Sequence, residues 1–352
     1  MTGTIRTRAR QTLRSPRLRL ATRLAVGVGV LLAVVARVGT GPLLHGIQSL
    51  DGRTIGAALV LGAIATVAAA WRWRIIAARL GLLLPLPNAV AMYYRSQFLN
   101  TVLPGGVVGD VHRAIAAGHR TEIGSSGRSV ALERAAGQVV QVTLAVVVLA
   151  FFGAEFEGPL LATVAIGLGA LAIAGIAIGL VSLRARRMLL REPRRLGAAL
   201  GSPAVAIRVS ALSVIVVACH IATFTIATAA VGTAVAPLRM LTLAFVVLLG
   251  ASIPLNVGGW GPREGIAGWA FALAGFGAAA GVSASTLFGA LTIISVAPGA
   301  VITAVSALRR RRTEAAAPRP AEPAAGPQRA RAPIRSTDSP FALAAATKEK
   351  TP

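Results

Sequence analysis

The chain has 352 residues, of which 55% are hydrophobic and 14% are charged, and its mean hydropathy is +0.71. Soluble globular domains carry about 25% charged residues, so this chain has too little polar surface to cover a water-soluble fold. The composition therefore excludes soluble enzymes and predicts a polytopic membrane protein. The net charge of +24 does not predict nucleic-acid binding, because the arginines flank the apolar runs, as is typical of the cytoplasmic ends of membrane spans.

Eight apolar runs approach the length of about 20 residues that a helix needs to cross a bilayer. We predict an all-α, polytopic membrane helix bundle with about eight transmembrane helices and re-entrant segments. The predicted crossings are 24–44, 54–71, 131–152, 159–183, 209–236, 239–256, 264–282 and 283–308. The chain then divides into a basic N-terminal segment (1–23), a transmembrane domain (24–308) and a disordered tail rich in proline and alanine (309–352).

The charges of the loops predict the orientation of these crossings. Arginines are concentrated in 1–23, in 72–128, in 184–195 and in 309–312, whereas the loop after the third run holds Glu155 and Glu157 and no base. Since positively charged loops stay on the cytoplasmic side, we expect a multi-pass protein of the cell membrane with cytoplasmic N- and C-termini.

Two segments break the helical pattern, and the first lies at 88–117. Tyr93, Gln97 and Asn100 fall on one helical face of a stretch that is too short and too polar to cross alone. The break that follows contains Pro104, Gly105, Gly106 and Gly109. Irregular backbone at membrane depth is tolerated only beside protein or a wet cavity. We therefore predict a re-entrant hairpin from the cytoplasmic side; the alternative is an interfacial amphipathic helix with an ordinary loop.

The second break lies at 252–264, directly before another apolar run. It contains Pro254, Gly258, Gly259 and Gly261. Arg263 and Glu264 open the next helix. Capping explains Glu264, because the positive end of the helix dipole favours a carboxylate. A cation is disfavoured there, so Arg263 needs a carboxylate, a phosphate or water.

Polar residues also stand at the start of the third predicted crossing, where Glu133 and Arg134 precede Gln138 and Gln141. Arg134 and the two glutamines share one helical face. Polar side chains at this depth usually face the interior of the bundle. Hydrogen bonds between helices are the structural alternative for the glutamines.

These segments supply the candidate substrate-binding residues, which we expect to converge in the cytoplasmic half of the bundle. They are Asn100, Asp110, Arg113, Glu133, Arg134, Arg263 and Glu264. The planar fork of arginine matches two phosphate oxygens, so the set suits an anionic head group. The repeated order of two spans, a break ending in an acid and two spans also indicates duplication, with parallel halves related by an axis along the membrane normal.

The sequence offers no signal for a metal or a cofactor, and we expect none. His45, His112, His119 and His220 show no ligand spacing, and we expect His220 to be a hydrogen-bonded core residue. No aspartate pair at metal-binding spacing accompanies them. We expect a membrane lipid substrate, anionic lipid at the cytoplasmic face and no nucleic acid as partners, while protein partners are not indicated.

Three motifs in order resemble the flippase-like family named for the transmembrane region of lysylphosphatidylglycerol synthase, the membrane half of the multiple peptide resistance factor. They are residues 97–113 (QFLNTVLPGGVVGDVHR), 133–137 (ERAAG) and 252–264 (SIPLNVGGWGPRE). The resemblance covers about 24–308 and implies a bundle that flips or binds lipids. In the two-part enzyme a soluble domain transfers an aminoacyl group, and the segment 309–352 is too short and too polar to be that domain.

We therefore expect a stand-alone, flippase-like lipid transporter without synthase activity. It would translocate or bind a lipid with an anionic head group or a polyprenyl-linked lipid. The alternatives are a membrane scaffold or regulatory subunit, and an integral-membrane enzyme acting on lipid-linked substrates.

Overall fold

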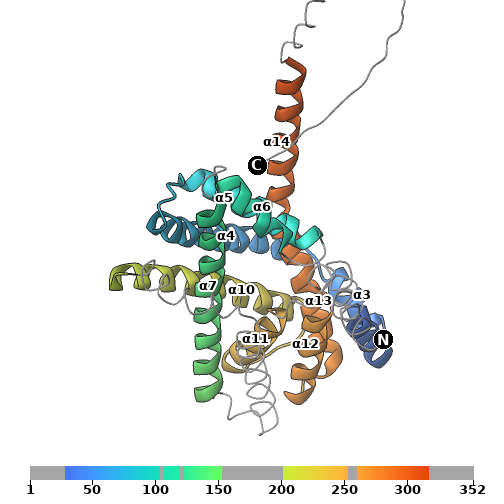
Figure 1. Ribbon diagram of the computed structural model, residues 1–352. Coiled ribbons are helices and arrows are strands. Elements are labelled where there is room, and N and C mark those ends of the chain that lie inside the picture. Colours follow the sequence, from blue (N-terminus) through green and yellow to red (C-terminus); the bar gives the residue numbers. More distant parts are fainter. Residues whose placement is uncertain (1–27, 104–106, 119–122, 153–200, 253–259, 317–352) are drawn as a thin grey trace, which may run out of the picture. The chain divides into compact units, whose positions relative to one another are not determined.

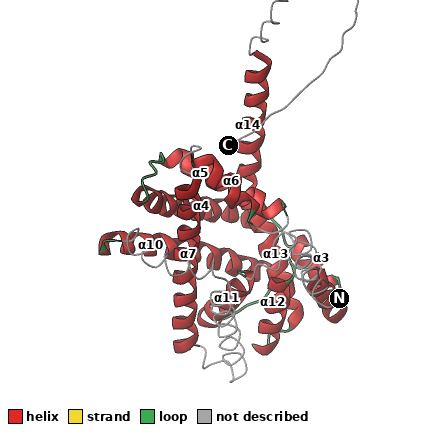
Figure 2. Ribbon diagram, in the orientation of Figure 1, coloured by secondary structure: helices red, strands yellow, loops and turns green. Residues whose placement is uncertain are grey.

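The computed structural model describes residues 28–103, 107–118, 123–152, 201–252 and 260–316 (Figure 1). The chain separates into two units, Met1–Ala307 and Leu308–Pro352, and the description that follows concerns the first. The regular elements in the described ranges are α-helices (Figure 2). This confirms the predicted all-α membrane fold.

The described helices follow one another through short turns. A first helix, Val28–Val38, meets α3 (Gly41–Gln48) at a bend of 99°. The others are α4 (Gly52–Arg79), α5 (Leu86–Val102), α6 (Val108–Ala117), α7 (Ile123–Phe152), α10 (Pro203–Ala230), α11 (Pro237–Ala251), α12 (Pro262–Leu273), α13 (Ala278–Ser295) and α14 (Ala297–Ala316), which continues into the second unit.

Four stretches of the described chain are long and apolar enough to cross a membrane, or five if the bent pair at 28–48 counts as one span. The four are Gly52–Arg79, Gly124–Phe152, Pro203–Ala230 and Ala278–Arg309. They correspond to the predicted crossings 54–71, 131–152, 209–236 and 283–308, and the bent pair corresponds to 24–44. The predicted crossing 159–183 lies outside the described residues, so the count of eight is not confirmed.

The prediction of a single crossing over 264–282 is wrong. Helix α12 ends at Leu273, and Gly275 and Gly277 adopt φ values of 83° and 84°, which favour glycine and end the helix. Helix α13 then packs back against α12, so closely that a Cβ on Gly281 would overlap the carbonyl oxygen of Ala267. The preceding α11 has only 15 residues, about 22 Å, and is short for the predicted crossing 239–256.

Helices α5 and α6 form the hairpin that the sequence predicts at 88–117. With 17 and 10 residues they are too short to cross a bilayer separately. The two helices pack on each other where Gly109 meets α5, because a Cβ there would overlap the carbonyl oxygen of Ser96. Whether the hairpin re-enters the membrane stays a prediction.

The long helices α4 and α10 pack side by side in opposite directions (Figure 1). Arg72, near the end of α4, donates a hydrogen bond to Ser213 in the first half of α10. Ala58, near the start of α4, joins Phe224 and Ala227 near the end of α10 in one apolar cluster. This packing does not test the predicted parallel halves, because they pair 54–71 with 239–256 and not with 209–236, so they stay a prediction.

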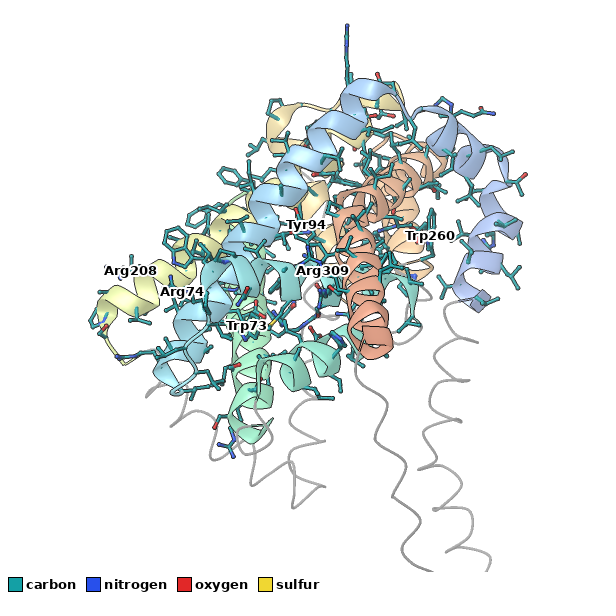
Figure 3. All side chains as sticks on the ribbon, turned by 90° about the horizontal axis from the view of Figure 1, so that it is seen from above. Trp73, Arg74, Tyr94, Arg208, Trp260 and Arg309 are labelled. Atoms are coloured by element: carbon teal, nitrogen blue, oxygen red, sulfur yellow. The ribbon has the colours of Figure 1, made fainter. Side chains whose placement is uncertain are left out.

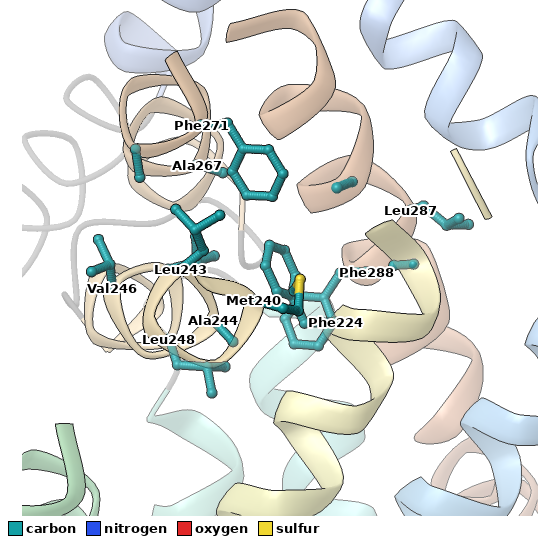
Figure 4. Close-up of a cluster of buried hydrophobic side chains, with 14 of the residues drawn as sticks. Phe224, Met240, Leu243, Ala244, Val246, Leu248, Ala267, Phe271, Leu287 and Phe288 are labelled. Carbon is teal, nitrogen blue, oxygen red and sulfur yellow. The ribbon is translucent and has the colours of Figure 1, made fainter. Parts of the chain in front are cut away.

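The main hydrophobic core lies among α10, α11, α12 and α13 (Figure 4). Phe224 is fully buried and meets Phe271 and Phe288 edge to face, with ring centroids 6.2 and 5.6 Å apart. Leu243 and Leu287 are also fully buried in this cluster. This core packs α10–α13 together, whereas the larger of two charged clusters lies among α4–α7.

Candidate functional site

Glu133 of α7 is the centre of the larger polar cluster, and its side chain is completely buried. Its Oε1 accepts hydrogen bonds from Arg72, whose Nε lies 3.1 Å away, and from the Tyr93 hydroxyl at 3.1 Å. Its Oε2 pairs with Nη2 of Arg113 at 3.0 Å. A buried carboxylate remains ionised only when such partners replace water, and here α4, α5 and α6 each contribute one.

Arg113 of α6 lies between two aromatic rings. Its guanidinium carbon stands 4.6 Å from the centre of the Trp73 ring and 4.3 Å from that of Tyr93. Nε and Nη1 of this buried arginine have no hydrogen-bond partner among the described residues, so the faces of the rings stabilise that part of the cation. Trp73 is itself fixed by a 3.0 Å hydrogen bond to Ser129 of α7.

Asp110 and Arg134 form the accessible edge of this cluster. Asp110 Oδ2 lies 2.7 Å from Nη2 of Arg134, and its Oδ1 accepts from Ser96 at 3.1 Å and from Arg113 at 3.4 Å. The Arg134 side chain is 53% exposed, whereas that of Arg113 is 1% exposed. Arg134 is therefore the arginine of this cluster that has room to exchange its carboxylate for another anion.

A pocket of about 230 Å³ opens beside this edge. Arg72, Asp110, Glu133 and Arg134 all line it, together with Tyr93, Ser96, Gln97, Gln138, Gln141, Ser213 and His220. Most of these groups donate hydrogen bonds or carry charge. The pocket therefore offers a polar, partly desolvated environment between α4, α5, α7 and α10.

Arg263 and Glu264 form a second, separate cluster at the start of α12. Nε and Nη2 of Arg263 donate to Oε1 of Glu264 at 3.0 and 2.6 Å, and Ser285 bonds to both residues. The other oxygen of Glu264 accepts the N–H of Gly261 at 2.7 Å. The capping prediction for Glu264 is thereby confirmed, and the carboxylate that Arg263 needs is its own neighbour.

Arg263 also lines a pocket of about 260 Å³. The guanidinium lies 5.6 Å from the ring of Trp260 and 5.4 Å from that of Phe288. In Figure 3, Trp73 and Trp260, which flank the two arginine clusters, are clearly separated. The two pockets share Gln141, Val216, Val217 and His220 in their linings, so they adjoin along α7 and α10.

Of the seven predicted binding residues, the structure places four in one ion-pair network and a fifth beside it. The other two lie in a separate cluster. Asp110, Arg113, Glu133 and Arg134 share one ion-pair network. Asn100 adjoins it as a structural link, because its Oδ1 accepts the N–H of Gly109 at 2.7 Å. The expectation of one convergent cluster is wrong, because Arg263 and Glu264 form a cluster of their own.

The predicted glycines and prolines of the two breaks are only partly described. Gly109 lies at the close contact of α6 with α5, and Gly261, with φ of 114°, precedes α12. Pro104, Gly105, Gly106, Pro254, Gly258 and Gly259 lie outside the described residues.

Arg72 is the main site residue that we did not predict. Because it directly follows an apolar run in the sequence, we interpreted it as a loop charge that marks the cytoplasmic side. The structure buries it at 5% exposure inside α4. The aromatic neighbours Trp71 and Trp73 were the available signal, because a helix that continues through them carries Arg72 inward.

His220 and Gln141 lie where the two pockets adjoin. His220 bonds through Nδ1 to the carbonyl oxygen of Val216 at 2.7 Å, as expected for a hydrogen-bonded histidine of the core, and it also lines both pockets. Gln141 donates to the Leu248 carbonyl at 3.2 Å and to the Ser252 hydroxyl at 3.1 Å. Gln141 therefore makes the interhelical hydrogen bonds that were the alternative to a binding role.

Comparison with protein families matches residues 20–299 to the model described as the lysylphosphatidylglycerol synthase TM region. The match includes both arginine clusters. Comparisons with curated proteins and with solved structures find no match.

Proposed function

The chain belongs to the family of the lysylphosphatidylglycerol synthase transmembrane region, and from this premise we propose that it binds and translocates a membrane lipid with an anionic head group. The family and the apolar helices make it a multi-pass membrane protein. The family region is distinct from the synthase domain, which fits a transporter-like role without catalysis.

The observation that carries this proposal is the charge balance of the cluster beside the 230 Å³ pocket. Three arginines (Arg72, Arg113 and Arg134) share two carboxylates (Asp110 and Glu133). Within this cluster one positive charge is left over. This extra charge belongs to Arg134, whose side chain is half exposed, so an anion can reach it from outside the cluster, and a phosphate-bearing head group would complete the site.

Arg134 is the residue that receives the head group. Its partner Asp110 already has hydrogen bonds from Ser96 and Arg113, so Asp110 stays paired when Arg134 turns to a phosphate. The planar guanidinium then binds two phosphate oxygens. Arg72 and Arg113 remain held by Glu133 and keep the pocket in shape.

In this proposal the lipid reaches the site from the cytoplasmic face, the side on which the loop charges lead us to expect the termini and the α5–α6 hairpin. A groove of about 440 Å³ lies at the end of α4, lined by Arg74, Arg79 and the 89% exposed Leu83. A basic groove with an exposed apolar residue suits anionic lipid at a membrane surface. The acyl chains stay in the bilayer while the head group enters the pocket.

Reconstitution into liposomes with fluorescent phospholipid or polyprenyl-phosphate lipids tests the proposal. The measurement is the rate at which labelled lipid moves from the protected to the exposed leaflet. We expect Arg134→Gln to slow this exchange about tenfold or more, because a hydrogen bond to a charged group contributes about 1.5–3 kcal/mol. Arg208→Gln, an exposed charge on α10 outside both pocket linings, is the matched control.

Two results would overturn the proposal. One is wild-type exchange no faster than in protein-free liposomes with every lipid offered. The other is an Arg134→Gln variant that exchanges lipid as fast as the Arg208→Gln control.

A further inference from the structure

We infer that α4–α7 and α10–α14 are an inverted duplication whose two short-helix hairpins approach the membrane from opposite faces. The two arginine clusters then belong to opposite faces as well. This arrangement follows from the helices alone. Only the route for a head group that we draw from it rests on the proposed function.

The first evidence is the match between α4 and α10. Both helices have 28 residues, and a side chain caps each at the preceding position, Asp51 for α4 and Ser202 for α10. In both cases the residue after the C-cap is a glycine with positive φ: Gly81 at 84° after α4 and Gly232 at 79° after α10. The next short helix then begins after the same number of turn residues.

The hairpins match in the same order. A 17-residue and a 10-residue helix follow α4, and a 15-residue and a 12-residue helix follow α10. In each hairpin the third residue of the second helix is an acid that bonds to an arginine: Asp110 in α6 and Glu264 in α12. A long apolar stretch follows each hairpin, Gly124–Phe152 and Ala278–Arg309.

The contacts between the two groups obey a two-fold relation. Helix α4 packs on α13 as α10 packs on α7. Helix α5 meets α14 through Arg95, which bonds to Ser306, as α11 meets α7 through Gln141, which bonds to Leu248. The equivalent helices α4 and α10 cross in opposite directions. A two-fold axis in the membrane plane produces these pairs, as in inverted-repeat transporters.

The opposite directions of α4 and α10 decide which face of the membrane each hairpin starts from. Both α4 and α10 are long enough to span, so the ends from which their hairpins start lie at opposite surfaces. The Asp110–Arg134 site is then reached from one face and the Arg263 pocket from the other. Since the two pockets adjoin along Gln141 and His220, they outline a route for an anionic head group between the two faces.

The two copies differ in chemistry. Trp73, Tyr93 and Gln97 of the first copy correspond to Phe224, Ala244 and Leu248 of the second when the matched helices are aligned from their first residues. The first copy therefore keeps the excess positive charge, whereas Arg263 and Glu264 balance each other. The head group binds more strongly on the face of the first hairpin and passes the second site with weaker attraction.

Cysteine labelling from the two sides of the membrane tests the duplication. In a full-length Cys219→Ala background, single cysteines replace Leu83 in the turn after α4, Ala234 in the turn after α10 and Leu273 at the end of α12, all exposed positions. A membrane-impermeant maleimide is added to intact and to permeabilised cells. Gln138→Cys and Ser252→Cys report the two pockets.

We expect the Ala234→Cys and Leu273→Cys variants to be labelled from one face and the Leu83→Cys variant from the other. The Ser252→Cys variant follows the first pair, and the Gln138→Cys variant follows Leu83→Cys. The duplication is overturned if Leu273→Cys reacts on the same side as Leu83→Cys, or if it is protected on both sides, as a continuous 264–282 crossing would require. Labelling needs no transport, so correct labelling without lipid exchange removes the proposed function and leaves the duplication standing.

Discussion

Glu133 links three helices through one side chain, which makes it the residue on which the polar cluster depends. Arg72 and Arg113 are both buried, and Glu133 is the carboxylate that each of them contacts most closely. Removing one partner of a buried ion pair leaves an uncompensated charge and costs about 3–5 kcal/mol. This cost does not apply to the ion pair of Arg134, because its side chain is half exposed to solvent.

We therefore predict that Glu133→Gln lowers the unfolding free energy by about 3–5 kcal/mol, because buried Arg72 loses its counter-charge and Arg113 keeps only its longer pair with Asp110. Arg134→Gln, one residue away, changes it by about 0–1 kcal/mol, since an exposed ion pair contributes little. Thermal unfolding in detergent measures both. A Glu133→Gln variant as stable as Arg134→Gln would show that water, and not Glu133, stabilises the arginines.

Residue identity alone indicated part of this network. Glu133 and Arg134 stand at the start of an apolar run, where charges need partners, so their position pointed inward. The partners themselves come from α4 and α6, far away in the sequence, and only packing brings them together. Arg72 was missed because a charge near the end of an apolar run looks the same whether the helix stops or continues.

The short helices place the charges, and glycine sets how closely they approach. Gly109 puts α6 directly against the backbone of α5, and the next residue, Asp110, then reaches Ser96 and Arg134. Any side chain at Gly109 meets backbone atoms, which yield less than a flexible side chain does. The position of the proposed anion site thus depends on the absence of a Cβ atom at Gly109.

Gly109→Ala is predicted to destabilise the protein by about 1–3 kcal/mol through overpacking and to slow lipid exchange by moving Asp110 away from Arg134. Gly127→Ala is the control, because a Cβ there meets nothing within 4 Å. Since alanine favours helix over glycine by about 0.5–1 kcal/mol, Gly127→Ala should be neutral or stabilising. Thermal unfolding and the liposome assay read both effects, and equal behaviour of the two variants would contradict the close contact.

At the scale of elements, hydropathy predicted the long helices well and the second hairpin badly. The apolar residues of 239–256 and 264–282 satisfy a length criterion that is blind to backbone conformation. Gly275 and Gly277 reverse the chain inside this apolar stretch, so α12 packs on α13. The first hairpin was recognisable because its helix carries Tyr93, Gln97 and Asn100 on one face, whereas α11 has no comparable polar face.

For the whole molecule, the two matched groups of helices, α4–α7 and α10–α14, differ in the kind of side chains that they bury. The second group contains the main apolar core, and the first contains the charged cluster. The match is visible at Trp73 and Phe224, which occupy equivalent places: Trp73 stacks on Arg113, while Phe224 packs on Phe271 and Phe288. Because apolar side chains stand in α10 and α11 where polar ones stand in α4 and α5, the duplication is hard to recognise from residue identity.

This division predicts different consequences at the two equivalent positions. Phe224→Ala should lower the unfolding free energy by about 3–5 kcal/mol, since it opens a cavity in the core, while the surviving folded protein keeps its lipid exchange rate. Trp73→Phe keeps an apolar ring but loses the hydrogen bond to Ser129, so it should cost about 0.5–1.5 kcal/mol and slow exchange by loosening Arg113. Phe151→Ala, at a position that is 76% exposed, serves as the control and should change neither quantity. Unfolding in detergent gives the stabilities, and exchange per folded molecule gives the activity. If Phe224→Ala instead abolished exchange in the folded fraction, the core of the second group would belong to the transport route and the division would fail.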